Sequence, residues 1–385
     1  MRKGIWQEFD GYQEIVEEIA VSQKLGQKFT PEIFSPQQYI DRLHPRRLCL
    51  RVNDIIAETP STKTFRLASE DQYLPPFQAG QYITLYLEIG HIRTSRPYSI
   101  SSQPNQRGYY DITVKRVAAG LVSHFLLDRI HRGDTLTSSG PEGHFFFNPL
   151  IHQKNMVCIA GGSGITPVMS MIREICARGL DRTVTLFYGN RTTDDVIFHD
   201  ELTYLSDRFK NIDYIPVIEE PADEYGGACG FMTGALIEEI IGDIDRKSFF
   251  VCGPKGLYDF CLPELEGLGI PRRKIRQELY GPPLDICEHP GWPQEIDADA
   301  VFTVKVKEGL QLKAKATETL LVSLEKSGLV LPTLCRSGDC SMCRLKILSG
   351  KVFQPAGVPV RKSDRQFGYA HACVSYPLED LEVLI

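Results

Sequence analysis

The sequence predicts a multidomain protein that contains an antiparallel β-barrel, a doubly wound α/β domain and a small third domain built around cysteines. Three observations lead to this prediction. The 385 residues correspond to two or three domains at about 150 residues each. Short strand-like segments separated by turns fill residues 47–150, whereas strands alternate with helices over residues 151–281. Four cysteines then follow between residues 335 and 373.

Composition and charge exclude several classes of protein. The chain is 42% hydrophobic and 24% charged, which is typical of a globular protein with more than one core. Its net charge of −6 argues against nucleic acid or an anionic membrane as the main partner. The longest uncharged run, residues 155–172, contains three glycines and a proline, so no membrane span is expected. Because acidic residues (Glu8 and Asp10) come early and no apolar segment follows, we expect no signal peptide and a cytoplasmic location.

Residues 1–45 predict a helical N-terminal extension. Apolar residues recur there at helical spacing on one face: Ile5, Phe9, Tyr12, Val16 and Ile19. Ser35 and Pro36 indicate the start of a second short helix that ends before Pro45. We expect the extension to pack as an arm over the core, and a docking element for a partner protein is the alternative.

Residues 46–150 predict an antiparallel β-barrel. Strand patterns with frequent turns recur in three segments: 48–52, 82–87 and 110–115. The extended segment Arg96-Pro97-Tyr98-Ser99 suits a flavin, because Tyr98 can lie on the ring, Arg96 can pair with a phosphate and Ser99 can hydrogen-bond the ring edge. By itself, this tetrapeptide is more typical of an ordinary strand.

Two later segments strengthen the flavin interpretation. Gly120-Leu121-Val122-Ser123 opens an apolar helix, whose free N–H groups could bind a diphosphate. Residues 140–145, Gly-Pro-Glu-Gly-His-Phe, predict a tight turn that leads into an aromatic strand.

These segments, in this order, resemble the flavin domain of the ferredoxin–NADP reductase superfamily. The resemblance implies an FAD site formed by Arg96, Pro97, Tyr98, Ser99, Thr113, Lys115, Gly120, Val122 and Ser123. FMN stays open, because a single phosphate could use the same helix. Lys115 and Arg116 could also be solvated surface charges.

Residues 151–281 predict a doubly wound α/β domain with a largely parallel sheet. Strand patterns occur at 156–160, 183–188, 212–218 and 248–252, and helical patterns at 168–178, 199–209, 234–242 and 255–267. The turn after the first strand, residues 161–167, reads Gly-Gly-Ser-Gly-Ile-Thr-Pro. Such a turn lets a pyrophosphate approach the backbone, although it is not the usual G-x-G-x-x-G.

The superfamily resemblance therefore extends over residues 47–281. It implies a nicotinamide-nucleotide site formed by Gly161, Gly162, Gly164, Thr166, Pro167, Cys252, Gly253 and Pro254, with Tyr280 near the flavin. It also implies that Ser99, Cys252 and Glu278 order and protonate the flavin–nicotinamide site. Taken alone, Cys252 could be a buried thiol and Glu278 a solvated charge. Arg191 could meet the 2′-phosphate of NADPH or be a surface cation, so NADH and NADPH both stay open.

The C-terminal cysteines predict an iron–sulfur site. Cys335, Cys340 and Cys343 have the spacing C-x4-C-x2-C, and Cys373 follows after 29 intervening residues. This is the plant-type [2Fe–2S] pattern, and Gly338 gives the loop the freedom to fold its N–H groups towards sulfur. Zinc is an alternative, but structural zinc sites favour two paired C-x2-4-C motifs. The other seven of the eleven cysteines are expected to be mostly buried small residues.

The segments around these cysteines fit a small β-rich domain. Strand patterns occur at 302–306, 310–315 and 343–348, and Thr319 precedes a short apolar helix that ends at Gly328. Residues 300–385 therefore resemble the plant-type ferredoxin domain, a β-grasp fold. In that family the closing cysteine lies in a segment similar to residues 370–374, Ala-His-Ala-Cys-Val.

The predicted order is an extension (1–45), a flavin domain (46–150), a nucleotide domain (151–281), a proline-rich linker (282–299) and a ferredoxin domain (300–385). Chains of this order resemble the reductase components of multicomponent oxygenases, such as those for phenylacetyl-CoA or aromatic rings. The resemblance implies electron transfer from NAD(P)H through FAD and the cluster to a separate acceptor protein, with an oxygenase component favoured. A corrinoid or other anaerobic acceptor, or a role as a redox sensor, are the alternatives.

Overall fold

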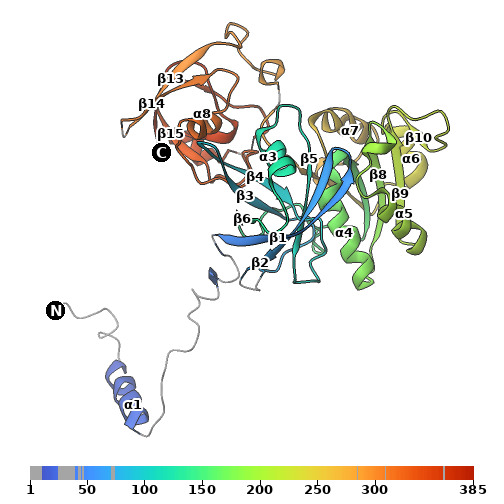
Figure 1. Cartoon of the computed structure of the whole chain (residues 1–385), viewed down its shortest axis with the longest axis horizontal. Helices are drawn as coiled ribbons and strands as arrows, with labels where there is room; N and C mark the ends of the chain where they lie inside the picture. Colours follow the sequence, from blue (N-terminus) through green and yellow to red (C-terminus); the bar gives the residue numbers. More distant parts are fainter. Residues whose placement is uncertain are drawn as a thin grey trace. The chain divides into compact units, whose positions relative to one another are not determined.

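The computed structural model of the chain describes residues 11–24, 40–41, 45, 47–70, 74–283, 285–307, 309–358 and 360–385 (Figure 1). The chain divides into two compact units, Met1–Pro45 and Arg46–Ile385. None of the described helices is both long and apolar enough to cross a membrane.

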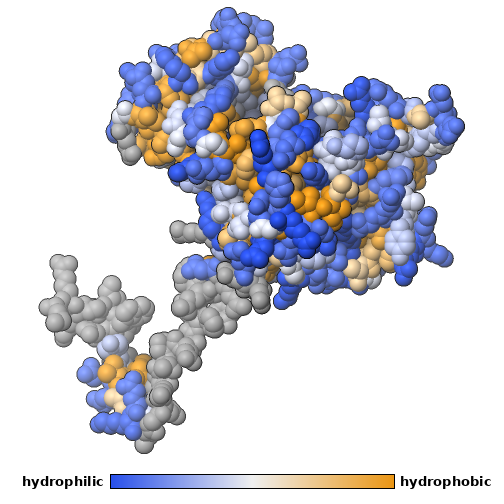
Figure 2. Space-filling view, viewed as in Figure 1, coloured by the Kyte–Doolittle hydropathy of each residue, from blue (hydrophilic) through white to orange (hydrophobic). Residues whose placement is uncertain are grey.

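The first unit contains helix α1 (Tyr12–Lys24), which includes the predicted Tyr12, Val16 and Ile19. No side chain of α1 is buried. Figure 2 shows apolar and charged side chains together on this helix, and Val16 and Ile19 are among its exposed apolar residues. The predicted residues Ile5 and Phe9, and the Ser-Pro pair at 35–36, lie outside the described residues.

An antiparallel sheet forms the first domain of the second unit. Among the described residues its six strands are β1 (Leu48–Thr59), β2 (Thr62–Ser69), β3 (Tyr82–Ile89), β4 (Ile92–Ser99), β5 (Tyr110–Lys115) and β6 (Thr135–Ser138). They pair in the order β4-β3-β6-β1-β2-β5, and an isolated bridge between Ile100 and Ile112 brings the two edges of the sheet together. Leu48, Leu50 and Val52 alternate with exposed residues along β1, so one face of the sheet forms the core. Helix α3 (Leu121–Arg129) covers this core.

The sequence predicts an aromatic strand after Gly143. The described residues contain no strand between β6 and β7 (Asn155–Gly161), so this prediction is wrong. Gly143 has a φ of +103°. Phe145 is buried instead against the ring of Phe250, at a centroid distance of 5.5 Å. Packing between domains therefore decides the conformation of this segment, rather than its strand propensity.

The second domain has a parallel sheet covered on both faces by helices. Its described strands are β7, β8 (Thr183–Asn190), β9 (Ile212–Ile218), β10 (Ala228–Cys229), β11 (Lys247–Cys252) and β12 (Ile275–Glu278), in the order β10-β9-β8-β7-β11-β12. Its helices are α4 (Ile165–Arg178), α5 (His199–Arg208), α6 (Gly234–Ile241) and α7 (Lys255–Gly267). Alternate residues of β7 point into two different apolar clusters: Cys158 into one, and Val157 and Ile159 into the other. This pattern confirms the doubly wound α/β prediction.

The third domain is a mixed sheet with a short helix against it. Its described strands are β13 (Val301–Val306), β14 (Gln311–Lys315), β15 (Arg344–Ser349), β17 (Tyr369–His371) and β19 (Leu381–Leu384), in the order β14-β13-β19-β15-β17. The remaining short elements are α8 (Leu320–Lys326), α9 (Lys362–Gln366), β16 (Val352–Phe353) and β18 (Tyr376–Pro377). As predicted, Thr319 caps α8, and its hydroxyl accepts a hydrogen bond from the Val322 N–H at 3.4 Å. Trp292, from the linker, packs against Phe353 and Tyr376 of this domain.

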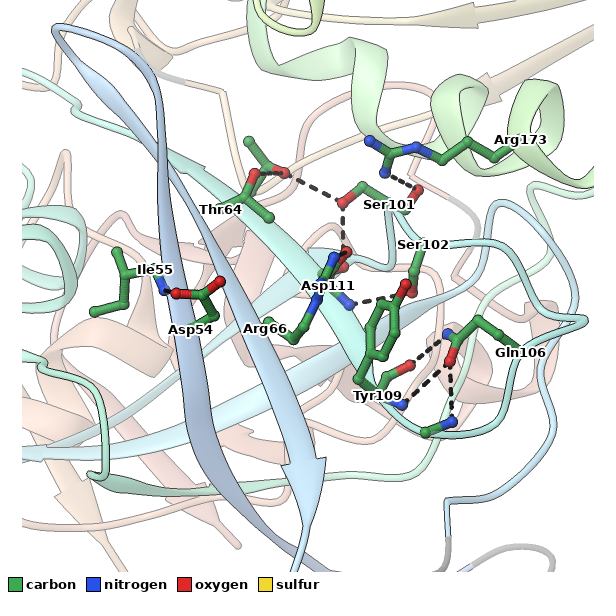
Figure 3. A network of polar contacts seen from close by, with 12 residues as sticks. Asp54, Ile55, Thr64, Arg66, Ser101, Ser102, Gln106, Tyr109, Asp111 and Arg173 are labelled. Atoms are coloured by element: carbon green, nitrogen blue, oxygen red, sulfur yellow. Dashed lines mark hydrogen bonds and ion pairs between the residues drawn. The ribbon is translucent and has the colours of Figure 1, made fainter. Parts of the chain in front are cut away.

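Helix α4 joins the nucleotide domain to the flavin domain. The Ser170 hydroxyl donates to the Ser102 carbonyl at 2.6 Å, and the Arg173 guanidinium donates to the Ser101 carbonyl at 2.8 Å. Figure 3 shows Arg173 reaching Ser101 at the edge of a polar network in the barrel that includes the Arg66–Asp111 ion pair. These contacts hold α4, the helix that follows β7, against the segment that follows β4.

Candidate functional site

The extended segment predicted to hold the flavin lies at the end of β4. Ser99 is buried, and its hydroxyl is 2.7 Å from the Tyr280 hydroxyl. Arg96 donates through Nη1 to the Thr94 hydroxyl and to the Ser95 carbonyl, both at 2.7 Å. Burial, together with the nearby Arg336, lowers the pKa of Arg96 to about 10. Pro97 separates Arg96 from Tyr98, and both Pro97 and Tyr98 are half-buried.

Cys252 and Glu278 lie opposite each other on the neighbouring parallel strands β11 and β12. The Cys252 thiol donates to the Tyr280 hydroxyl at 3.4 Å, so Ser99 and Cys252 both contact Tyr280. Burial raises the pKa of Cys252, which keeps this thiol protonated. Burial also raises the pKa of the half-buried Glu278 to about 8, and the neighbouring Asp339 and Cys335 act in the same direction.

The structure therefore brings the predicted trio Ser99, Cys252 and Glu278 into one region formed by three strands. Tyr258, which the sequence analysis did not single out, fixes this region. Its hydroxyl accepts from the Gly253 N–H at 3.2 Å and donates to the Glu278 carbonyl. No local sequence signal marks this tyrosine, because its partners come from two other segments of the chain.

A cleft of about 370 Å³ opens at the carboxyl ends of the parallel strands. Five predicted residues line it together with Asn190: Gly161, Gly162, Pro254, Lys115 and Arg191. Asn190 is buried and lies near the Tyr188 hydroxyl, yet neither its Nδ2 nor its Oδ1 has a hydrogen-bond partner. A buried amide without partners on the wall of such a cleft fits a bound polar ligand, such as a nucleotide.

Two predicted glycines, one in the loop after β7 and one after β11, lie in close contact with neighbouring backbone. A Cβ on Gly164 would lie 2.1 Å from the Cys252 carbonyl oxygen, and a Cβ on Gly253 would lie 3.2 Å from the Gly161 nitrogen. The helix begins at Ile165, so Thr166 and Pro167 belong to its first turn rather than to the predicted loop. The Thr166 hydroxyl donates to the Ser163 carbonyl at 3.1 Å and stabilises this turn.

The predicted phosphate-binding turn before α3 is closed by its own serine. The Ser123 hydroxyl accepts from the Val117 N–H and donates to the Gly120 carbonyl, both at 3.1 Å. A Cβ on Gly120 would lie 2.7 Å from the Ser123 oxygen, so the turn requires glycine. Val122 packs into the core of the barrel. The main-chain N–H groups at the start of α3 are then the groups left to meet a phosphate.

Thr113, Lys115 and Arg116 have different surroundings. The Thr113 hydroxyl lies 2.8 Å from the Thr64 hydroxyl inside the barrel. Lys115 lines the nucleotide cleft and lies 3.6 Å from Asp195. Arg116 is exposed and pairs with Asp128, which fits the surface-charge alternative.

The loop that carries the first three cysteines points N–H groups at sulfur. The N–H groups of Ser337 and Cys340 donate to the Cys335 sulfur at 3.4 and 3.3 Å. The loop needs left-handed backbone at three positions, with φ of +57° at Arg336, +85° at Gly338 and +58° at Ser341. Such N–H donors stabilise thiolates and tune the potential of iron–sulfur clusters.

The four predicted cysteine ligands meet in the structure, although they come from two segments. A contact with Cys340 lowers the pKa of Cys335, and a contact with Cys373 lowers the pKa of Cys343. All four are free thiols. In the described part of the chain, no three His, Cys, Asp or Glu side chains are arranged around a single metal ion. Cys373 contacts both Cys335 and Cys343, so the four thiols lie next to one another. Four such thiols beside N–H donors fit a [2Fe–2S] cluster.

Three family models match the chain in the predicted order. They are the oxidoreductase FAD-binding domain at residues 49–147, the oxidoreductase NAD-binding domain at 158–262 and the 2Fe-2S iron-sulfur cluster binding domain at 304–378. The chain is 30% identical over 366 residues to the glycine betaine monooxygenase reductase subunit of Chromohalobacter salexigens, which covers 90% of this chain and 98% of that protein.

The chain belongs to the oxygenase-reductase group of the ferredoxin–NADP reductase superfamily. This reductase is also 29% identical to the NADH oxidoreductase HCR of Escherichia coli, over 86% of this chain and 96% of that one. Its fold matches the solved structure of phthalate dioxygenase reductase with a TM-score of 0.65 and 26% identity, over 88% of this chain and 97% of the other. These matches confirm the fold class and the predicted cofactors, namely FAD, NAD(P)H and a [2Fe–2S] cluster. The reductase is therefore an electron-transferring oxidoreductase.

Proposed function

We propose that this reductase delivers the electrons of NAD(P)H to a separate oxygenase component. The relatives support this proposal, because their names include reductase subunits for glycine betaine monooxygenase and for 1,2-phenylacetyl-CoA epoxidase. The observation that carries it is one neighbourhood of predicted site residues: Ser99 and Cys252 both contact Tyr280, and Glu278 lies opposite Cys252. Cys335 lies close enough to Glu278 to raise the pKa of its carboxyl group. The cytoplasmic location predicted from the sequence stays a prediction.

A flavin held at Arg96, Tyr98 and Ser99 would supply a group that can take up a hydride and release electrons one at a time, and a cluster on the four cysteines would supply a one-electron acceptor. Tyr280 covers Ser99 and Cys252, so we assign it the role of holding this site closed until the nicotinamide enters. Ser99 then offers its hydroxyl to the ring edge, and the protonated Cys252 thiol orders the nicotinamide. Glu278 holds a proton near neutral pH, since its pKa is raised to about 8.

We infer that NADH is the better donor. Arg191, the residue that could bind a 2′-phosphate, forms an ion pair with Glu220 at 3.0 Å. Glu220, Glu219 and Asp195 all raise the pKa of Arg191, so three carboxylates lie near this guanidinium, and Lys115 pairs with only one of them, Asp195. A dianionic 2′-phosphate would be repelled there, whereas a ribose diol would not be. Glu220→Gln is expected to improve NADPH use relative to NADH.

The main test is anaerobic reduction by NADH, followed by optical absorbance and by electron paramagnetic resonance. The flavin should bleach first, and a reduced [2Fe–2S] signal should follow. Ferricyanide and cytochrome c then serve as acceptors in steady state, and two molecules of cytochrome c should be reduced per NADH. Cys340→Ser should lose the cluster signal and cytochrome c reduction but keep ferricyanide reduction. A redox sensor would show no rapid NADH oxidation with either acceptor.

A further inference from the structure

The junction between the flavin domain and the ferredoxin domain contains buried charged groups. Glu325 of α8 and Arg336 of the cysteine loop are each at most 5% exposed. Arg336 binds both carboxylate oxygens of Glu325, at 2.6 and 3.0 Å. The Thr94 hydroxyl of β4 donates to the same carboxylate at 3.0 Å. Glu325 therefore connects the strand that carries the flavin segment to the loop that carries Cys335.

The same hydroxyl also meets the predicted phosphate ligand, because Arg96 donates to Thr94 at 2.7 Å. A continuous path of polar contacts thus runs from Arg96 through Thr94 and Glu325 to Arg336. A second contact supports the docking, since the Thr84 hydroxyl donates to the Leu334 carbonyl at 3.0 Å. Leu334 and Arg336 flank Cys335, so both neighbours of this cysteine are held by the flavin domain, Leu334 directly and Arg336 through Glu325.

One of the two guanidinium groups on this path has no carboxylate of its own. Arg336 is paired with Glu325, whereas no ion pair of the described residues includes Arg96, which contacts only Thr94 and Ser95. Burial and Arg336 both lower the pKa of Arg96, while Glu325 opposes them. A half-buried guanidinium without an ion pair is costly until an anion compensates it. A phosphate on Arg96 would supply that anion through a charge-assisted hydrogen bond.

We propose that Thr94 and Glu325 are positioning residues that couple binding of the flavin phosphate at Arg96 to docking of the ferredoxin domain beside the flavin site. The inference rests on the proposed function only in taking Arg96 as the phosphate ligand. Flavin binding tightens the docking, and docking tightens flavin binding by the same factor, since such coupling is reciprocal. A chain without flavin then has a more loosely docked ferredoxin domain.

The test uses the full-length protein, stripped of flavin but retaining its cluster, with and without FAD. Hydrogen–deuterium exchange of peptides from α8 reports the docking. FAD is expected to slow this exchange by about five- to tenfold in the wild-type protein, near the low end of typical coupling factors. In Thr94→Val this slowing is lost, and the dissociation constant of FAD, measured by fluorescence, rises by the same factor. Thr94→Ser keeps the hydroxyl and restores both.

Thr185→Val provides the matched control, because the Thr185 hydroxyl donates to Asp213 in the nucleotide domain, away from this junction. It should leave both measurements unchanged. Equal FAD-dependent slowing in the wild type and in Thr94→Val would overturn the coupling. FAD binding that does not slow the exchange of the α8 peptides in the wild-type protein would also overturn the coupling, but it would leave the proposed function intact. A protein that binds no FAD would overturn the proposed function as well.

Discussion

The flavin domain has two junctions with its neighbours, and they are built differently. At the junction with the nucleotide domain, Ser170 and Arg173 donate to main-chain carbonyls, and the Arg173 charge is compensated by Glu201 within its own domain at 2.5 Å. At the junction with the ferredoxin domain, Thr94 donates to a buried carboxylate that is already bound to Arg336.

This difference indicates different roles for the two junctions. Main-chain carbonyls are present whatever is bound, so the first junction holds the nucleotide cleft beside the flavin segment permanently. At the second junction Glu325 is paired with Arg336, and Arg96 has no ion-pair partner among the described residues, so the strength of this junction depends on an anion. The hydride-transfer site is therefore fixed by the chain itself, whereas the docking of the electron outlet responds to the cofactor.

The largest effect is expected at the second junction. Glu325→Leu leaves Arg336 buried without a partner, so we expect a loss of about 3–5 kcal/mol in the unfolding free energy of the ferredoxin domain. Thermal unfolding followed by cluster absorbance measures this loss. The double variant Glu325→Leu with Arg336→Met removes both charges and should recover most of it. Equal instability of the single and double variants would show that the charge is not the cause.

A smaller loss is expected from Gly164→Ala, which acts near the first junction. The new Cβ would meet the Cys252 carbonyl oxygen at 2.1 Å and force the turn after β7 away from the end of β11. Overpacking of this kind costs about 1–3 kcal/mol or more. Gly267→Ala is the control, because a Cβ there meets nothing within 4 Å and alanine favours the helix. Circular dichroism should show a lower Tm for the first variant only.

Ser170→Ala tests the first junction directly. It removes the hydrogen bond to the Ser102 carbonyl, at a cost of about 1 kcal/mol. Ser206→Ala removes a similar bond, to the Ile212 carbonyl, within the nucleotide domain. Both should lower Tm by similar amounts, but only Ser170→Ala should slow flavin reduction by NADH in stopped-flow absorbance. Equal reduction rates in both variants would show that this junction does not influence hydride transfer.

A pH dependence of stability is expected from Glu278. Its folded pKa of about 8 exceeds its ordinary value of 4.5, so the folded state binds more protons than the unfolded state between these pH values. The unfolding free energy should therefore fall as pH rises from 5 to 8. Glu278→Gln lacks this contribution, so its stability relative to wild type should rise over the same range. If the unfolding free energies of the wild type and of Glu278→Gln change with pH in the same way, the raised pKa of Glu278 is contradicted.

Regular elements were predicted best where the periodicity was strong. The patterns at 110–115, 212–218 and 255–267 coincide with β5, β9 and α7. The prediction missed β2, and it placed an aromatic strand where Phe145 packs onto Phe250 instead. In the segment around Phe145, a contact with another domain overrides the local propensity. The predicted domain boundaries and the individual roles of the site residues stay predictions.

The sequence by itself determined the chemistry of this protein. Most of the residues that we predict to bind one group lie close together in the chain, as in Cys335, Cys340 and Cys343 or the glycines after β7, and their spacing predicts the group they bind. Only the tertiary structure decided how the domains are joined. Thr94 and Glu325 are 231 positions apart, and the importance of their contact comes from burial, which has no signature in either local segment. Charge balance in a buried junction is a property of the assembled fold, because it depends on which distant groups share the same desolvated space.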